Sequence, residues 1–164
     1  MAIRSLRGLP DESQTIDTTS RVIDRSTFAS YQEELAATAE ERAVQRQHPK
    51  GKNTARERIN LLLDPGSFTE IGQFVGGSML EGYLGAAVVT GIGMVDGNPI
   101  AVYAQDFSIS GGTLGEAEGD KIISIMDKAL ELRIPIVAML DSGGARLPEG
   151  AVALGQYGRI FRNT

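Results

Sequence analysis

Two short glycine turns carry the residues best suited to chemistry in this sequence. One reads Ser110-Gly111-Gly112-Thr113 and the other Ser142-Gly143-Gly144-Ala145-Arg146, and each follows an apolar run and precedes a segment with helical spacing. Glycine lets a ligand approach the backbone closely, and the start of a helix offers unpaired N–H groups with a partial positive charge. Such turns suit a phosphate, a carboxylate or a developing oxyanion. Alternatively, the glycines only let the chain turn between strand and helix, and the spacing alone does not decide between these interpretations.

The charged residues beside the turns also have two interpretations. Arg146 either holds a ligand phosphate or forms a structural bridge with Glu149 or Asp141. The carboxylates that flank the first turn either perform acid–base work or, as we favour, stabilise the start of the following helix by their charge. These carboxylates are Asp106, Glu116, Glu118 and Asp120.

The composition excludes several classes of site. The 164 residues contain no cysteine and one histidine, His48, so we expect no thiolate nucleophile and no metal centre built from several histidines or cysteines. A net charge of −5 argues against a general nucleic-acid binder. No apolar run approaches the ~18 residues of a membrane span, and the first residues lack the apolar middle of a signal peptide. We therefore expect a cytoplasmic protein that binds no nucleic acid and no membrane.

The elements that must position the turns can be predicted in outline. Residues 1–24 are polar and predict a flexible arm, and residues 25–164 predict a domain. Residues 26–47 have helical composition, and a second helix should follow a capping box formed by Thr54 and Glu57. Strand-like segments then cover residues 68–71, 86–95 and 100–104, and Asp96-Gly97 predicts a hairpin between the last two.

The segments around the turns alternate between helix and strand. Thr113 and Glu116 predict a capping box for a helix that ends near Leu132, with Leu130 on its apolar face. Residues 135–140 form a continuous apolar run, which predicts a strand buried on both faces. A final helix should begin near Pro148. This order predicts an α/β fold.

Several ordered blocks of this sequence resemble biotin-dependent acyl-CoA carboxyltransferases, the β subunits of propionyl-CoA and acetyl-CoA carboxylases. The resemblance covers about residues 38–164. Its blocks are Lys50-Gly51-Lys52-Asn53-Thr54-Ala55-Arg56-Glu57-Arg58-Ile59, Leu62-Leu63-Asp64-Pro65-Gly66-Ser67-Phe68, Val88-Val89-Thr90-Gly91, Gln105-Asp106-Phe107-Ser108, Gly111-Gly112-Thr113-Leu114-Gly115-Glu116, Asp141-Ser142-Gly143-Gly144-Ala145-Arg146 and Tyr157-Gly158-Arg159-Ile160-Phe161-Arg162-Asn163.

The resemblance implies a crotonase-like spiral of ββα units, here incomplete and preceded by N-terminal helices. It implies transfer of a carboxyl group from carboxybiotin, carried on a partner protein, to the α-carbon of a short acyl-CoA, with no metal. It places Ser142, Gly143, Gly144, Ala145, Arg146, Gly111 and Gly112 in the substrate pocket. The main oxyanion-hole glycines of the family would lie beyond Thr164.

Activity would therefore require partners. The resemblance implies a complementary carboxyltransferase chain or segment, a biotin carboxyl carrier or biotin carboxylase subunit, and assembly into a homo- or hetero-oligomer. Two alternatives stay open: an inactive binding or scaffold protein with half a crotonase fold, and a biotin-independent crotonase-like decarboxylase or thioesterase. Departures from the family pattern at Ala86-Ala87 and Pro148 leave the acyl group undefined.

Overall fold

A computed structural model describes residues 25–78 and 83–164 of the chain. The predicted arm, residues 1–24, lies outside the described residues. The chain divides into two compact units, residues 1–33 and 34–164, and the second carries the sheet and both glycine turns. Helix α1 (Arg25–Gln47) begins in the first unit and ends in the second, within one residue of the predicted bounds.

The short N-terminal elements of the second unit are fixed by local hydrogen bonds. Helix α1 is followed by the 3-10 turn η1 (His48–Lys50) and by helix α2 (Ala55–Leu62). The Thr54 hydroxyl accepts from the Glu57 amide at 3.1 Å, and the Glu57 carboxylate accepts from the Thr54 amide at 2.8 Å. These reciprocal bonds confirm the predicted capping box at this helix start.

A four-stranded sheet forms the centre of the unit, in the order β1-β4-β5-β6. Strands β4 (Val88–Val95) and β5 (Asn98–Gln105) pair as an antiparallel hairpin. Its turn residues Asp96 and Gly97 have φ of 50° and 74°, the left-handed conformation that a two-residue hairpin turn requires. Strand β1 (Thr69–Glu70) runs antiparallel to β4, and β6 (Ile136–Met139) runs parallel to β5. Strands β2 (Gly77–Ser78) and β3 (Tyr83–Leu84) form a separate two-stranded sheet.

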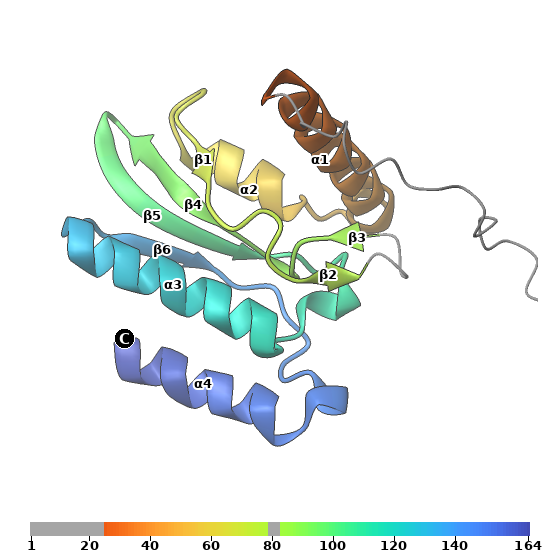
Figure 1. Ribbon diagram of the computed structural model, residues 1–164, viewed down its shortest axis with the longest axis vertical. Coiled ribbons are helices and arrows are strands. Elements are labelled where there is room, and N and C mark those ends of the chain that lie inside the picture. The colour runs from red at the N-terminus through yellow and green to blue at the C-terminus, as the bar shows by residue number, and fades with distance from the viewer. Residues whose placement is uncertain (1–24, 79–82) are drawn as a thin grey trace, which may run out of the picture. The chain divides into compact units, whose positions relative to one another are not determined.

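Helices cover both faces of the central sheet (Figure 1). Alternating side chains of β5 point to opposite faces, as the two-residue repeat of a strand requires. On one face, Val102 and Ala104 pack with Ile59 and Leu63 near α2. On the other face, the sheet packs against helix α3 (Glu116–Leu132). The buried residues of that face are Ala86, Val88, Ala101, Tyr103, Leu114, Ile122, Ile123, Ile125, Met126, Ala129 and Ile160.

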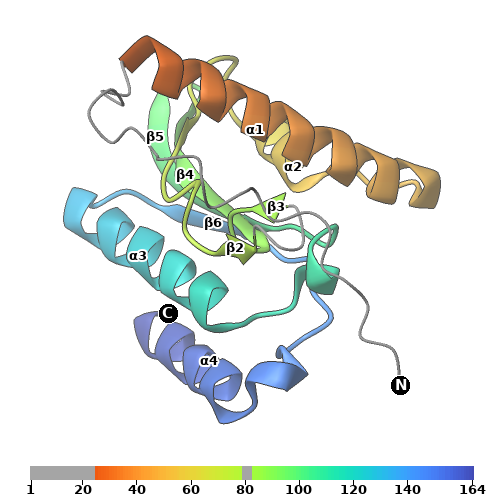
Figure 2. The ribbon, with the colours of Figure 1, turned by 45° about the vertical axis from the view of Figure 1, so that its right-hand side comes forward.

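The C-terminal part adds a further helical layer. After β6 the chain passes through the 3-10 turn η3 (Leu147–Glu149) into helix α4 (Ala151–Asn163). Helix α4 runs alongside α3 on the side away from the sheet, as both views show (Figure 2). The two helices touch closely where Gly119 of α3 meets the side chain of Gln156.

Three local predictions were wrong. The start of α3 is not capped by Thr113 and Glu116: Gly115 is the N-cap residue, and its amide donates to Glu118 at 3.1 Å. Strand β6 is half-buried rather than buried on both faces, because it pairs with β5 alone among the described residues and lies at the sheet edge. Leu130 is 79% exposed although its spacing follows the apolar face of α3.

Candidate functional site

The two glycine turns lie against each other in the folded chain. The first turn forms η2 (Ser110–Gly112) after β5, and the second follows β6. Their backbones are joined by hydrogen bonds from the Gly143 amide to the Gly111 carbonyl at 2.9 Å and from the Leu114 amide to the Gly144 carbonyl at 2.9 Å. A further bond joins the Arg146 amide to the Leu114 carbonyl at 2.8 Å. Segments about 30 residues apart in sequence therefore form one backbone unit, through a parallel bridge between Leu114 and Ala145.

The contact between the turns requires glycine at position 112. Gly112 has a φ of +64°, and a Cβ added there would lie 2.2 Å from the Asp141 carbonyl oxygen. The buried side chain of Gln105 reinforces the same contact, because its amide oxygen accepts from the Asp141 amide at 3.2 Å. Close approach between the turns, as well as chain reversal, therefore explains this glycine.

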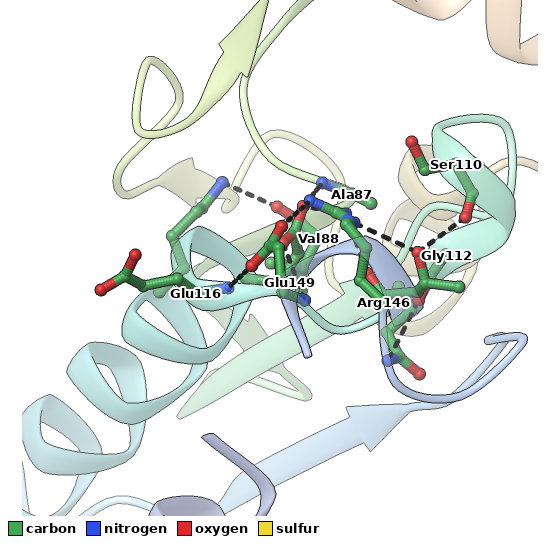
Figure 3. A network of polar contacts seen from close by, with 12 residues as sticks. Ala87, Val88, Ser110, Gly112, Glu116, Arg146 and Glu149 are labelled. Carbon is green, nitrogen blue, oxygen red and sulfur yellow. Dashed lines mark hydrogen bonds and ion pairs between the residues drawn. The ribbon is translucent and has the colours of Figure 1, made fainter. Parts of the chain in front are cut away.

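Arg146 is the centre of the polar network that holds the turns (Figure 3). Its guanidinium donates to the Glu118 carboxylate at 2.7 Å, to the Thr113 carbonyl at 2.9 Å and to the Glu149 carboxylate at 3.1 Å. The structural interpretation of this arginine is therefore correct for Glu149, and Glu118 rather than Asp141 is its second carboxylate partner.

Glu118 extends the network to the central sheet. Its side chain is 4% exposed, and it accepts from the Ala87 amide at 2.8 Å while also capping α3. Glu149 in turn accepts from the Glu116 amide at 2.6 Å. Of the four carboxylates that flank the first turn, Glu118 therefore stabilises the helix start as predicted, whereas Asp120 pairs with Arg159 and Asp106 accepts from the Ser108 amide.

The electrostatics of the network follow from burial and pairing. Burial alone would lower the pKa of Arg146, but its hydrogen bond to Glu118 and the charges of Glu118 and Glu149 outweigh this effect and raise the pKa. Arg146 is therefore a cation whose charge is paired with internal carboxylates.

Lys121 lies one turn after Glu118 on α3, and burial lowers its pKa to about 8. The Lys121 ammonium donates to the Val88 carbonyl at 2.7 Å.

A pocket of about 690 Å³ opens beside the paired turns. Its walls are formed by Ser110, Thr113, Gly143, Ala145, Arg146, Leu147 and Pro148. The Gly143 amide donates to Gly111, and the Gly144 amide donates to the Ser142 hydroxyl at 3.1 Å, so neither is free for a ligand. In the parallel bridge, Ala145 turns its own N–H away from Leu114. The amides of Ala145, Ser110 and Leu147, which all lie in the pocket wall, donate no hydrogen bond to the described residues, so they are the backbone donors available there.

Only some of the seven residues that were predicted to form the substrate pocket line this pocket. Gly143, Ala145 and Arg146 line this pocket, whereas Gly112 is buried and Gly111 lines a neighbouring cavity. Ser142 is exposed and supports the turn. Sequence reasoning missed Gln105 and Lys121, which carry no local pattern that predicts a long-range contact, and it gave Glu118 no partner.

The remaining features of the described chain bear on what the site can hold. Residues 25–78 and 83–164 contain no group of histidine, aspartate and glutamate side chains arranged to bind a metal ion. Within the same residues, no helix combines the length and apolarity needed to cross a membrane.

Comparison with known proteins identifies the fold and the family. The fold is α/β and crotonase-like, as in transcarboxylase 12S, whose structure with methylmalonyl-CoA matches with a TM-score of 0.75 and 39% identity over 84% of this chain and 28% of that one. A family profile described as "Carboxyl transferase domain" matches residues 46–164, and this chain belongs to that family.

Two curated relatives are similar to the same region. The propionyl-CoA carboxylase beta chain of Saccharopolyspora erythraea is 49% identical in an alignment of 138 positions that covers 80% of this chain and 25% of that protein. The methylmalonyl-CoA decarboxylase subunit alpha of Veillonella parvula is 44% identical in an alignment of 127 positions that covers 74% of this chain and 25% of that protein. The chain therefore spans about a quarter of the length of these relatives.

Proposed function

We propose that this chain is part of an acyl-CoA carboxyltransferase that moves a carboxyl group from carboxybiotin to the α-carbon of a short acyl-CoA in the cytoplasm. The observation that carries the proposal is the docking of two glycine turns beside a 690 Å³ pocket, in a chain that matches a carboxyl transferase domain. In this reaction the N–C bond of carboxybiotin and an α-C–H bond break, a C–C bond forms, and the proton replaces the carboxyl group on the biotin nitrogen.

The protein must stabilise negative charge on the thioester oxygen while the α-proton leaves. We assign substrate binding to the paired turns, with Gly143 and Ala145 in the pocket wall and the Ala145 amide as a donor toward the thioester. Ser142, Gly144, Gly111 and Gly112 shape the turns, and Arg146 positions them through Glu118. An oxyanion hole needs donors that converge on one oxygen, and the complementary chain or segment would supply those that complete this one.

We assign no described residue to the biotin ring. Carboxybiotin would arrive on a carrier protein and supply the carboxyl group, and a biotin carboxylase subunit would reload it. The exposed apolar side chains on the β6, α3 and α4 side support obligate association with further protein, because water contact with such surface is unfavourable. They include Leu130, Leu140, Leu147 and Phe161, each at least 70% exposed.

Reconstitution tests the proposal. The chain is combined with a second polypeptide that corresponds to the part of the Saccharopolyspora relative beyond its match to this chain. Formation of the complex is followed by sedimentation, and carboxylation of acetyl-, propionyl- and butyryl-CoA by carboxybiotin is followed by mass spectrometry. We expect transfer only when both polypeptides are present. A monodisperse, stable monomer contradicts obligate association, and a stable complex without transfer to any of these acyl-CoA esters contradicts the function.

A second candidate is a decarboxylase, which the similarity to the methylmalonyl-CoA decarboxylase subunit favours. At the same thioester pocket, the bond between the α-carbon and the carboxyl group of a malonyl-type ester would break, CO₂ would leave, and a proton from water would be added to the α-carbon. The same complex, incubated with malonyl-CoA and methylmalonyl-CoA, distinguishes the two candidates. Loss of CO₂ without carboxylation in the forward direction would favour the decarboxylase.

A further inference from the structure

Gln105 is the last residue of β5, and its side chain reaches both glycine turns. Its amide oxygen accepts from the Asp141 amide at 3.2 Å, and its amide nitrogen donates to the Gly112 carbonyl at 3.5 Å. Asp141 leads into the second turn, and Gly112 is the last residue of η2 in the first. Gln105 is 6% exposed, so both bonds form away from water. One buried side chain therefore links the two turns.

The side-chain amide of Gln105 takes the place of a peptide group where the parallel strands end. The pairing of β5 with β6 ends at Ala104 and Met139. Beyond this pair, the Gln105 amide offers one acceptor oxygen and a donor nitrogen, as a peptide group does. Its partners fix its orientation, because a flipped amide would place N–H against N–H and C=O against C=O. The Gln105 main chain is also held, since Arg58 of α2 donates to its carbonyl.

The backbone donors available in the thioester pocket are divided between the two turns. Ser110 belongs to the first turn, Ala145 belongs to the second, and Leu147 follows it. Donors stabilise an oxyanion only where they are aimed at the same oxygen, so the relative position of the turns decides whether these amides can act together. A misplacement of about 1 Å can cost on the order of 100-fold in rate. A side chain that joins the turns therefore controls a sensitive distance.

From this arrangement we infer that Gln105 is a positioning residue for the proposed carboxyl transfer. Gln105 is not among the residues that form the pocket wall. It acts through Asp141 and Gly112, and so holds the Ser110 and Ala145 amides in a fixed relation to each other. The inference rests on the proposed function for the reaction, whereas the link between Gln105 and the turns can be measured without turnover.

The first test is kinetic and uses the reconstituted complex. Gln105→Met removes both hydrogen bonds and keeps an unbranched side chain of similar length. It should lower kcat for the preferred acyl-CoA ester at least about tenfold and change KM less than about threefold, because charge on the thioester oxygen develops in the transition state. A side chain that served the substrate pocket only through its shape would change KM instead.

The matched control is Gln156→Met, which removes an equally buried glutamine of α4. Gln156 is 4% exposed, donates to Asp120 at 3.3 Å and accepts from Arg159 at 2.8 Å. Its loss should leave kcat within about twofold of the wild type. Both variants are assayed at a temperature at which urea unfolding shows each complex to be folded, so that a loss of stability does not count as a loss of kcat.

The second test is amide hydrogen exchange of the full chain, followed by NMR. The loss of one hydrogen bond between the turns should speed exchange about tenfold. We expect this in Gln105→Met at the Asp141 amide and at the Gly143 and Leu114 amides, which bond from one turn to the other. The same three amides should exchange at the wild-type rate in Gln156→Met.

The two tests separate the failure of this inference from the failure of the proposed function. Equal kcat values in the Gln105→Met and Gln156→Met complexes, or equal exchange of the Asp141 amide in the two variants, would overturn the inference. If the wild-type complex transfers no carboxyl group but Gln105→Met speeds exchange at Asp141 and Leu114, the proposed function fails while the role of Gln105 in holding the turns stands.

Discussion

Replacing Glu118 by glutamine should destabilise the protein strongly, although the side chain keeps its shape. The Glu118 side chain is 4% exposed, and both of its oxygens accept hydrogen bonds, from Arg146 and Ala87 on one side and from Gly115 on the other. A glutamine amide has one accepting oxygen and one donating nitrogen. In either orientation, it therefore places an N–H group against another donor.

The loss can be estimated from these contacts. Removing one partner of a buried ion pair costs about 3–5 kcal/mol. Arg146 keeps its contact with Glu149, so we expect the lower end, about 3 kcal/mol. For an m-value of about 2 kcal/mol/M, the urea midpoint should fall by roughly 1.5 M.

The assay is equilibrium urea unfolding, with Glu131→Gln as the matched control. Glu131 lies on the same helix, its side chain is 67% exposed, and it pairs with Lys128 at 2.6 Å. An exposed pair contributes about 1 kcal/mol or less, so this variant should unfold close to the wild-type midpoint. A double-mutant cycle with Arg146→Met should give a coupling free energy of at least about 1 kcal/mol. If Glu118→Gln and Glu131→Gln unfold at the same urea concentration, the argument that Glu118 and Arg146 hold the turns together is refuted.

Two further predictions concern groups near this network. The pKa of Lys121 is about 8 in the folded protein, against 10.5 for an unperturbed lysine. Between these two pH values the unfolded chain binds more protons than the folded chain, so stability rises with pH. The rise from pH 7.5 to 9.5 should be roughly 2 kcal/mol in urea unfolding, and Lys121→Met should remove it; a wild-type stability that is flat or falls over this range would contradict the burial of a charged lysine. Gly112→Ala should cost at least about 2 kcal/mol, because its Cβ would lie 2.2 Å from the Asp141 carbonyl oxygen. Gly111→Ala has nearly the same φ, +65°, but its Cβ would meet only Phe107 at 3.9 Å, so it should cost about 1 kcal/mol; equal losses of stability in the two variants would show that the turns are not in close contact.

The sequence predicted the site at the paired glycine turns, but it did not predict the second cavity beside the first turn. The glycine turns were visible because glycine pairs between an apolar run and a helical segment are a local pattern, and the structure places both turns side by side. The neighbouring cavity lined by Gly111 was not predicted, because its residues come from segments about 60 positions apart and are individually ordinary surface side chains. That the Ala145 amide faces away from Leu114 also depended on tertiary structure, because it follows from the parallel bridge between these two residues.

The sequence by itself determined the elements whose hydrogen bonds are local. The Asp96-Gly97 hairpin and the Thr54–Glu57 capping box formed as predicted, because their conformations are set within four residues. Tertiary structure alone decided which carboxylates pair with Arg146 and that β6 lies at the edge of the described sheet. The physical reason is that several nearby groups could satisfy the same donor or the same strand face, and only the packed chain brings one of them within bonding distance.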